Sequence, residues 1–156
     1  LPLAEQFTAA IGAMRGQFRS KYSEVQTVSD TLMMAVERAQ AAEPMNEVME
    51  SFQCYSAMTC LAGAFYASLA NQEDFDTAMI TAVNHSGRSA AVGAITGAFM
   101  GALLGEEALP EFYLECLEPT ATLQELADDL VQGCPMVRGS LLFDGDWESK
   151  YLHGEY

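Results

Sequence analysis

Residues 82–105 read AVNHSGRSAAVGAITGAFMGALLG, and this stretch decides the fold. It carries no charge between Arg88 and Glu106, and glycine recurs at every fourth position from Gly93 to Gly105. Residues four apart lie on one face of an α-helix, so the spacing predicts a helix with a continuous small-residue face. Because a glycine inside a helix costs about 1 kcal/mol relative to alanine, we expect this face to meet another backbone at close range. We therefore predict that this helix is the central one of an all-helical domain.

A polar elbow precedes this helix and is the candidate ligand site of the chain. It consists of five consecutive residues, His85, Ser86, Gly87, Arg88 and Ser89. The first backbone N–H groups of a helix have no intrahelical acceptor, and they attract anions such as phosphate. If the chain binds a ligand, we expect it at the elbow.

The composition indicates an acidic shell over one apolar interior. The chain has 156 residues, which is enough to bury a single core without disulfides or metals. Half of the residues are hydrophobic, and 22 acidic residues against 7 basic ones give a formal net charge of −15. Nucleic acids and anionic membranes bind clustered Lys and Arg, so we expect neither as a partner.

The cysteines and the N-terminal residues indicate the cellular compartment of the protein. Cys54, Cys60, Cys116 and Cys134 form no CxxC pair, and neither histidine lies at zinc-ligand spacing from them. We interpret them as small buried apolar residues in a reducing compartment. The start, LPLAEQ, lacks a basic segment followed by an apolar run. We therefore expect a cytoplasmic protein without a signal peptide, and the missing initiator Met leads us to expect that an upstream segment was removed.

A membrane interpretation has to be weighed because residues 51–72 are uncharged and the glycine spacing of residues 93–105 occurs in transmembrane packing faces. Both stretches are rich in Ala, Ser and Gly rather than Leu and Ile, and Lys or Arg anchors are missing at their ends. We therefore expect no membrane-spanning segment.

Further helices are predicted where apolar residues recur at spacings of three and four. Residues 54–70 are apolar on every side, so we expect that helix to be buried on every side. A capping box from Thr122 to Glu125 and a terminal Gly133 predict the last helix. We expect a single all-helical domain, residues 1–156, with a helical core (1–133) and a turn-rich C-terminal tail (134–156) packed on it. The other predicted helices are residues 2–19, 25 or 27 to 42, 75–83 and 109–117, and residues 45–52 are predicted to form a short amphipathic segment.

The central stretch resembles the C-terminal metal-binding motif of bacterial ADP-ribosylglycohydrolases, which in one subgroup reads AVNHSGDSDSTGAITG. This chain matches AVNHSG, then Ser89, then GAITG. The entry Glu73-Asp74-Phe75, an alanine-rich helix before the motif and Pro110 extend the similarity over about residues 51–130. The resemblance implies an orthogonal multi-helix bundle that corresponds to the C-terminal portion of that family's domain.

The chain departs from the family pattern at the positions that carry its chemistry. The resemblance implies that two aspartates, here replaced by Arg88 and Ala90, hold magnesium ions together with an aspartate pair from the N-terminal half, which is also missing. Ala91 and Val92 replace the Ser and Thr that follow. A guanidinium in place of a ligand adds positive charge beside a divalent cation, so we expect no metal and no cofactor. The family has the same histidine as His85, so we expect a hydrogen-bonded structural group there and assign no catalytic residue.

Two interpretations of Arg88 stay open. In one, its charge replaces the lost metal, and the elbow still holds a phosphate or diphosphate, such as that of ADP-ribose. In the other, the site has decayed, and Arg88 pairs with an acidic neighbour.

Three hypotheses of function follow. The first is a catalytically defective family member that acts as a binding or structural module. The second is an active magnesium-dependent hydrolase of ADP-ribosylated substrates, completed by a missing N-terminal half or a second chain. The third is a helical interaction domain that forms a homodimer.

Overall fold

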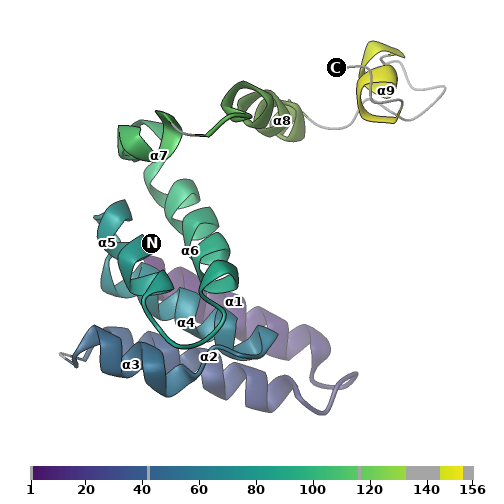
Figure 1. The fold of residues 1–156 in the computed structure, drawn as a ribbon. Helices are drawn as coiled ribbons and strands as arrows, with labels where there is room; N and C mark the ends of the chain where they lie inside the picture. Colours follow the sequence, from purple (N-terminus) through teal and green to yellow (C-terminus); the bar gives the residue numbers. More distant parts are fainter. Residues whose placement is uncertain (1, 42, 116, 133–144, 153–156) are drawn as a thin grey trace. The chain divides into compact units, whose positions relative to one another are not determined.

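The structure, a computed structural model, describes residues 2–41, 43–115, 117–132 and 145–152. Two units divide the chain, Leu1–Pro110 and Glu111–Tyr156, and each is described by itself. Within the described ranges the regular structure is helical and contains no strand, so the all-α prediction is confirmed (Figure 1). The first unit contains α1 (Leu3–Phe18), α2 (Val25–Ala39), α3 (Met45–Phe52), α4 (Ala57–Ala70), α5 (Phe75–Val83), α6 (Ser89–Leu104) and the short 3₁₀ helix η1 (Glu106–Ala108), and the second contains α7 (Glu111–Glu115), α8 (Thr120–Gln132) and α9 (Gly145–Leu152).

Helix α4 is the most enclosed helix of the first unit. It packs against α1, α2, α3, α5 and α6, and Cys60 and every residue from Ala62 to Leu69 are buried. Helix α6 buries only Val92, Gly93, Thr96 and Met100. The prediction that the glycine-rich helix is central is therefore wrong. Helix α6 packs mainly against α4 and α5, whereas α4 contacts five helices.

The start of α4 also differs from the prediction, which placed it at Cys54. Gln53 and Cys54 have positive φ angles of 60° and 43°, so the chain turns sharply before the helix. Ser56 then caps α4: its hydroxyl accepts from the backbone N–H of Thr59, and the Thr59 hydroxyl accepts from the backbone N–H of Ser56. This reciprocal pair satisfies two backbone donors at the helix start, and α4 therefore begins at Ala57.

Three phenylalanines join α1, α4 and α6. The ring centroids of Phe7 and Phe65 are 4.0 Å apart, and Phe99 lies 5.1 Å from Phe7 and 5.5 Å from Phe65. Phe7 and Phe65 are buried, and both belong to the core cluster that Phe99 packs against. Aromatic pairs at such distances stabilise a core by about 0.5–1.5 kcal/mol beyond the burial of their surface.

The glycine face of α6 packs against side chains of α5. A Cβ added to Gly93 would lie 3.0 Å from Cγ1 of Val83, and one added to Gly97 would lie 3.7 Å from Sδ of Met79. At Gly101 an added Cβ would meet nothing within 4 Å. The expected close approach of another backbone is therefore absent at these three glycines, and only the first half of the glycine face serves helix packing.

The two most apolar helices are short. Helix α4 has 14 residues and α6 has 16, whereas a membrane span needs about 20. Over the ranges that the structure describes, no helix is both long enough and apolar enough to cross a membrane.

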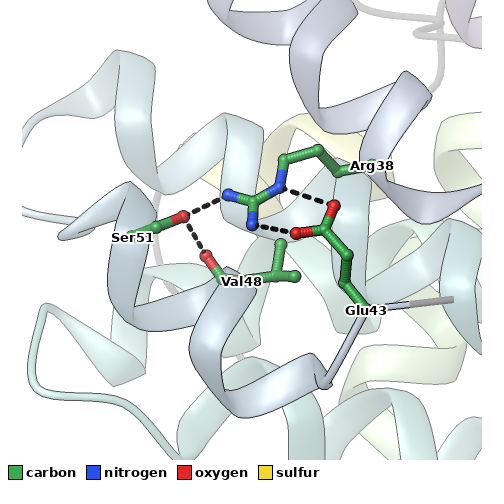
Figure 2. A network of polar contacts seen from close by, with 4 residues as sticks. All are labelled: Arg38, Glu43, Val48 and Ser51. Carbon is green, nitrogen blue, oxygen red and sulfur yellow. Dashed lines mark hydrogen bonds and ion pairs between the residues drawn. The ribbon is translucent and has the colours of Figure 1, made fainter. Parts of the chain in front are cut away.

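A polar network joins α2 to α3 (Figure 2). The guanidinium of Arg38 donates to both carboxylate oxygens of Glu43, at 3.2 and 2.6 Å, and to the hydroxyl of Ser51. That hydroxyl in turn donates to the carbonyl of Val48 at 2.6 Å. Arg38 lowers the pKa of Glu43 and lies 5.9 Å from the ring centroid of Phe52. The network fixes the turn between the two helices.

In the second unit, α8 begins at Thr120, so the predicted capping box at Thr122 lies inside the helix. Its side chains form ion pairs with α9: the ammonium of Lys150 lies 2.5 Å from Glu125 and 3.1 Å from Asp129. Helix α9 lies in the segment expected to be rich in turns. Residues 133–144 and 153–156 lie outside the described residues, and the division into a core and a packed tail stays a prediction.

Candidate functional site

The elbow joins the end of α5 to the start of α6. Asn84 closes α5, since its backbone and side-chain N–H groups both donate to the carbonyl of Ile80, at 3.2 and 2.8 Å. Arg88 is the N-terminal cap residue of α6, and Ser89 is its first residue. The structure therefore places the five predicted site residues together in one turn between two helices.

His85 is held by both ring nitrogens. Its Nδ1 accepts from the backbone N–H of Gly87 at 3.0 Å, and its Nε2 lies 3.0 Å from the carbonyl oxygen of Ala82. Because Nδ1 acts as the acceptor, the proton lies on Nε2, which donates to that carbonyl. Both ring nitrogens are therefore hydrogen-bonded, as expected, and the structural role of His85 stays a prediction.

Glu50, near the end of α3, is bound to the elbow. Its Oε1 accepts from the backbone N–H and from the hydroxyl of Ser86, both at 2.9 Å. The hydroxyl of Tyr55 donates to the carbonyl of Ser86 at 3.0 Å. Ser86 is thus joined to α3 by two hydrogen bonds and to the segment before α4 by one. Sequence reasoning missed Glu50, because nothing in an exposed glutamate 36 residues away marks this contact.

Gly87 lies against the turn that precedes α4. A Cβ added there would lie 2.4 Å from the carbonyl oxygen of Gln53 and 2.8 Å from Cβ of Cys54. The next backbone N–H, that of Arg88, donates to the carbonyl of Cys54 at 2.9 Å. Only glycine allows this approach, since any side chain would collide with backbone atoms. The strained turn at positions 53–54 and the elbow therefore form one packed joint.

Four backbone donors of the elbow, those of residues 86–89, are already bonded within the chain. The acceptors are Glu50 for the N–H of Ser86, the His85 ring for Gly87, the Cys54 carbonyl for Arg88 and the Gly87 carbonyl for Ser89. A helix start attracts anions, and the carboxylate of Glu50 lies at Ser86, three residues before α6 begins. A phosphate that used the donors of Ser86 would have to displace this carboxylate.

The side chains that replace the family aspartates are exposed. Arg88 forms no ion pair with any residue that the structure describes, so the expected pairing with an acidic neighbour is not found there. Magnesium requires carboxylate and water ligands, whereas the elbow offers a guanidinium, the methyl group of Ala90 and the engaged ring of His85. These residues do not fit a magnesium ion. Among the described residues, no three His, Cys, Asp or Glu side chains lie together as a metal site.

Two cysteines lie beside this joint. Cys54 and Cys60 are free and buried, as predicted, while Cys116 and Cys134 lie outside the described residues. The Cys60 thiol donates to the Cys54 carbonyl at 3.1 Å. Burial raises the pKa of the Cys54 thiol to about 11, with smaller contributions from Cys60 and Glu50. A neutral thiol is a poor nucleophile, so Cys54 is a packing residue.

Comparison with known proteins identifies the same family that the central motif resembles. The chain matches the family model described as ADP-ribosylglycohydrolase over residues 2–139. The match extends well beyond the motif and includes α1 to α3. No curated protein and no solved structure matches the chain.

Proposed function

The chain belongs to the ADP-ribosylglycohydrolase family, and from that premise we propose that it is a member without hydrolytic activity of its own. The proposal rests on the elbow. The positions of the implied metal ligands carry Arg88 and Ala90, and the ring of His85 is engaged at both nitrogens. A guanidinium next to a divalent cation is repulsive, and the carboxylate that contacts the elbow, that of Glu50, already accepts both donors of Ser86.

Between a binding role and a structural role for the elbow, one observation favours the structural role. The carboxylate of Glu50 accepts both donors of Ser86, at 2.9 Å each, where a bound anion would need them. A phosphate that replaced this carboxylate would form hydrogen bonds of the same charge-assisted kind, so it would gain little. Its binding would also cost entropy. We propose that the elbow is a structural joint between the turn at residues 53–54 and α6.

The test is a calorimetric titration of ADP-ribose into the chain, with and without magnesium, beside the variant Arg88→Asp/Ala90→Asp and the control Arg88→Gln. A structural elbow predicts that neither magnesium nor the substitutions change the heat of titration. Binding that needs no metal and that both Arg88 variants lose would instead make the elbow an ADP-ribose site in which Arg88 replaces the ions.

The second hypothesis, an active magnesium-dependent hydrolase completed by other residues, makes a different prediction. In that case the chain binds magnesium only when mixed with the N-terminal portion of a family member or with a second chain. Release of ADP-ribose from an ADP-ribosylated arginine protein, seen only in such a mixture, would support it.

A homodimer is a further proposal, and exposed apolar side chains favour it. Ile80 and Val83 of α5 are 51% and 41% exposed, and Leu103 of α6 is 38% exposed. Light scattering at increasing concentration tests it: a mass that stays at 16.9 kDa would exclude the dimer, and a mass that doubles and returns to monomer in Ile80→Lys would support it.

A further inference from the structure

A cavity of about 620 Å³ lies where the end of α1 meets the start of α2. One wall consists of Gly12, Arg15 and Gly16 of α1 and of Arg19, the residue that caps the end of α1. These positions follow the spacing of three and four residues that places side chains on one helical face. The volume lies within the range of about 300–1,000 Å³ that is usual for small-molecule sites. We call this cavity the Arg15–Arg19 pocket.

The two glycines of this wall have no packing role. A Cβ added to Gly12 or Gly16 would meet nothing within 4 Å. Glycine is unfavourable inside a helix, and here no neighbouring helix requires it. Because the two glycines have no side chains, they leave open space beside the arginines, and their backbone forms the floor of the pocket.

Arg15 contacts a neutral group, the amide of Gln26, which in turn donates to the carboxylate of Asp30 at 2.7 Å. Arg15 donates to the neutral amide oxygen of Gln26 at 3.0 Å, and neither it nor Arg19 forms an ion pair with any carboxylate in the described part of the chain. Lys21, which lies over the ring of Phe18 at 5.9 Å, adds a third cation nearby. Three of the seven basic residues therefore lie within residues 15–21 of a chain with net charge −15.

The shape of the charged groups indicates the class of ligand. A guanidinium binds phosphate through two parallel N–H donors, and two guanidinium groups one helical turn apart suit two linked phosphoryl groups. Tyr22 also lines the pocket, with 59% of its surface exposed, and offers an aromatic face to a base or sugar. We propose that the Arg15–Arg19 pocket binds a small molecule that carries a diphosphate. This site lies on other residues than the elbow, and the proposal does not depend on the function proposed above.

The experiment is a calorimetric titration of inorganic pyrophosphate and of ADP into the full chain at low ionic strength. We expect saturable binding that weakens as salt is added. The variant Arg15→Gln/Arg19→Gln should bind at least about tenfold more weakly, since it lacks both guanidinium groups. Glu37→Gln, at an exposed position of α2 outside the pocket, should bind as the unmodified chain does.

A second variant separates loss of the site from loss of the fold. Gly16→Leu fills the floor of the pocket with a good helix former, so it should abolish binding while the helical circular dichroism is retained. Tighter binding of ADP than of pyrophosphate, lost in Tyr22→Ala, would identify a nucleotide as the ligand, and equal binding would identify the diphosphate alone. Absence of saturable binding up to about 1 mM, or unchanged affinity in the double arginine variant or in Gly16→Leu, would overturn the proposal.

Discussion

Glu50 and Ser86, from α3 and from the turn before α6, are joined by two hydrogen bonds of 2.9 Å to a single carboxylate oxygen. The contact occupies the backbone N–H and the hydroxyl of Ser86, two donors of the elbow. It also links residues far apart in the chain, so it contributes to the packing of the first unit as well as to the chemistry of the site.

Replacing Glu50 by alanine should lower the free energy of unfolding by about 1 kcal/mol, because both donors of Ser86 lose their common acceptor but remain in contact with water. Glu37→Ala, at an exposed position of α2, is the matched control and should change stability by less than about 0.5 kcal/mol. Urea denaturation of the two variants measures the difference. Equal midpoints for Glu50→Ala and the unmodified chain would show that this contact contributes nothing.

Gly87→Ala should destabilise the protein by more than about 2 kcal/mol, because the new methyl group would collide with the backbone of residues 53–54. Gly101→Ala is the control: it lies in a helix with open space around it, and alanine there should raise stability by about 0.5–1 kcal/mol. Thermal unfolding of both variants tests the pair. A neutral Gly87→Ala would mean that the elbow and the turn are not packed together as described.

Acid should weaken the start of α5. Asp74 accepts from the backbone N–H of Thr77 at 3.1 Å and from its hydroxyl at 2.7 Å, and these bonds hold the pKa of Asp74 below its ordinary value of 3.8. A lowered folded pKa gives stability that is present above pH 3.8 and is lost as pH falls through the folded value. Asp74→Asn keeps a cap acceptor but does not titrate.

The variant should therefore lose less stability than the unmodified chain between neutral pH and about pH 3, as measured by denaturant midpoints across that range. Glu43, whose pKa is lowered by Arg38, contributes in the same direction in both proteins. Identical pH profiles would contradict the assigned role of Asp74.

Cys54 should resist alkylation in the folded protein. At about pH 8, a thiol with a pKa of about 11 is almost entirely protonated, and it is buried. The raised pKa also makes stability depend on pH. The contribution of Cys54 is fully present below the ordinary pKa of a thiol and is lost as pH rises toward 11. Iodoacetamide treatment followed by mass spectrometry, on a Cys116→Ser/Cys134→Ser variant, should label Cys54 only after urea is added. Rapid labelling of the folded chain would contradict this.

Local patterns predicted several elements well. The bounds of α3 and α5 agree with the predictions for residues 45–52 and 75–83, because proline, an acidic N-cap and apolar spacing mark these helices. The start of α4 was missed because an uncharged apolar run conceals the sharp turn at Gln53 and Cys54. The signal that was present is the Ser56 and Thr59 pair, which marks a helix N-terminus.

The candidate site was predictable in its position but not in its contacts. The motif placed His85 to Ser89 in one turn, and the structure agrees. What closes the turn is Glu50 and the carbonyl of Cys54, which approach only when α3 and the segment before α4 fold against it. The position of α6 was also not predictable from its own sequence. Its glycines indicated a central helix, but α4 has more buried residues.

The most direct test of the account is an assay for release of ADP-ribose from an ADP-ribosylated arginine protein by this chain alone, with magnesium present. An active homologous hydrolase serves as the positive control, and Arg88→Asp/Ala90→Asp is assayed in parallel. The account predicts no release above background by the unmodified chain. Release that depends on magnesium and is abolished by chelation would contradict it.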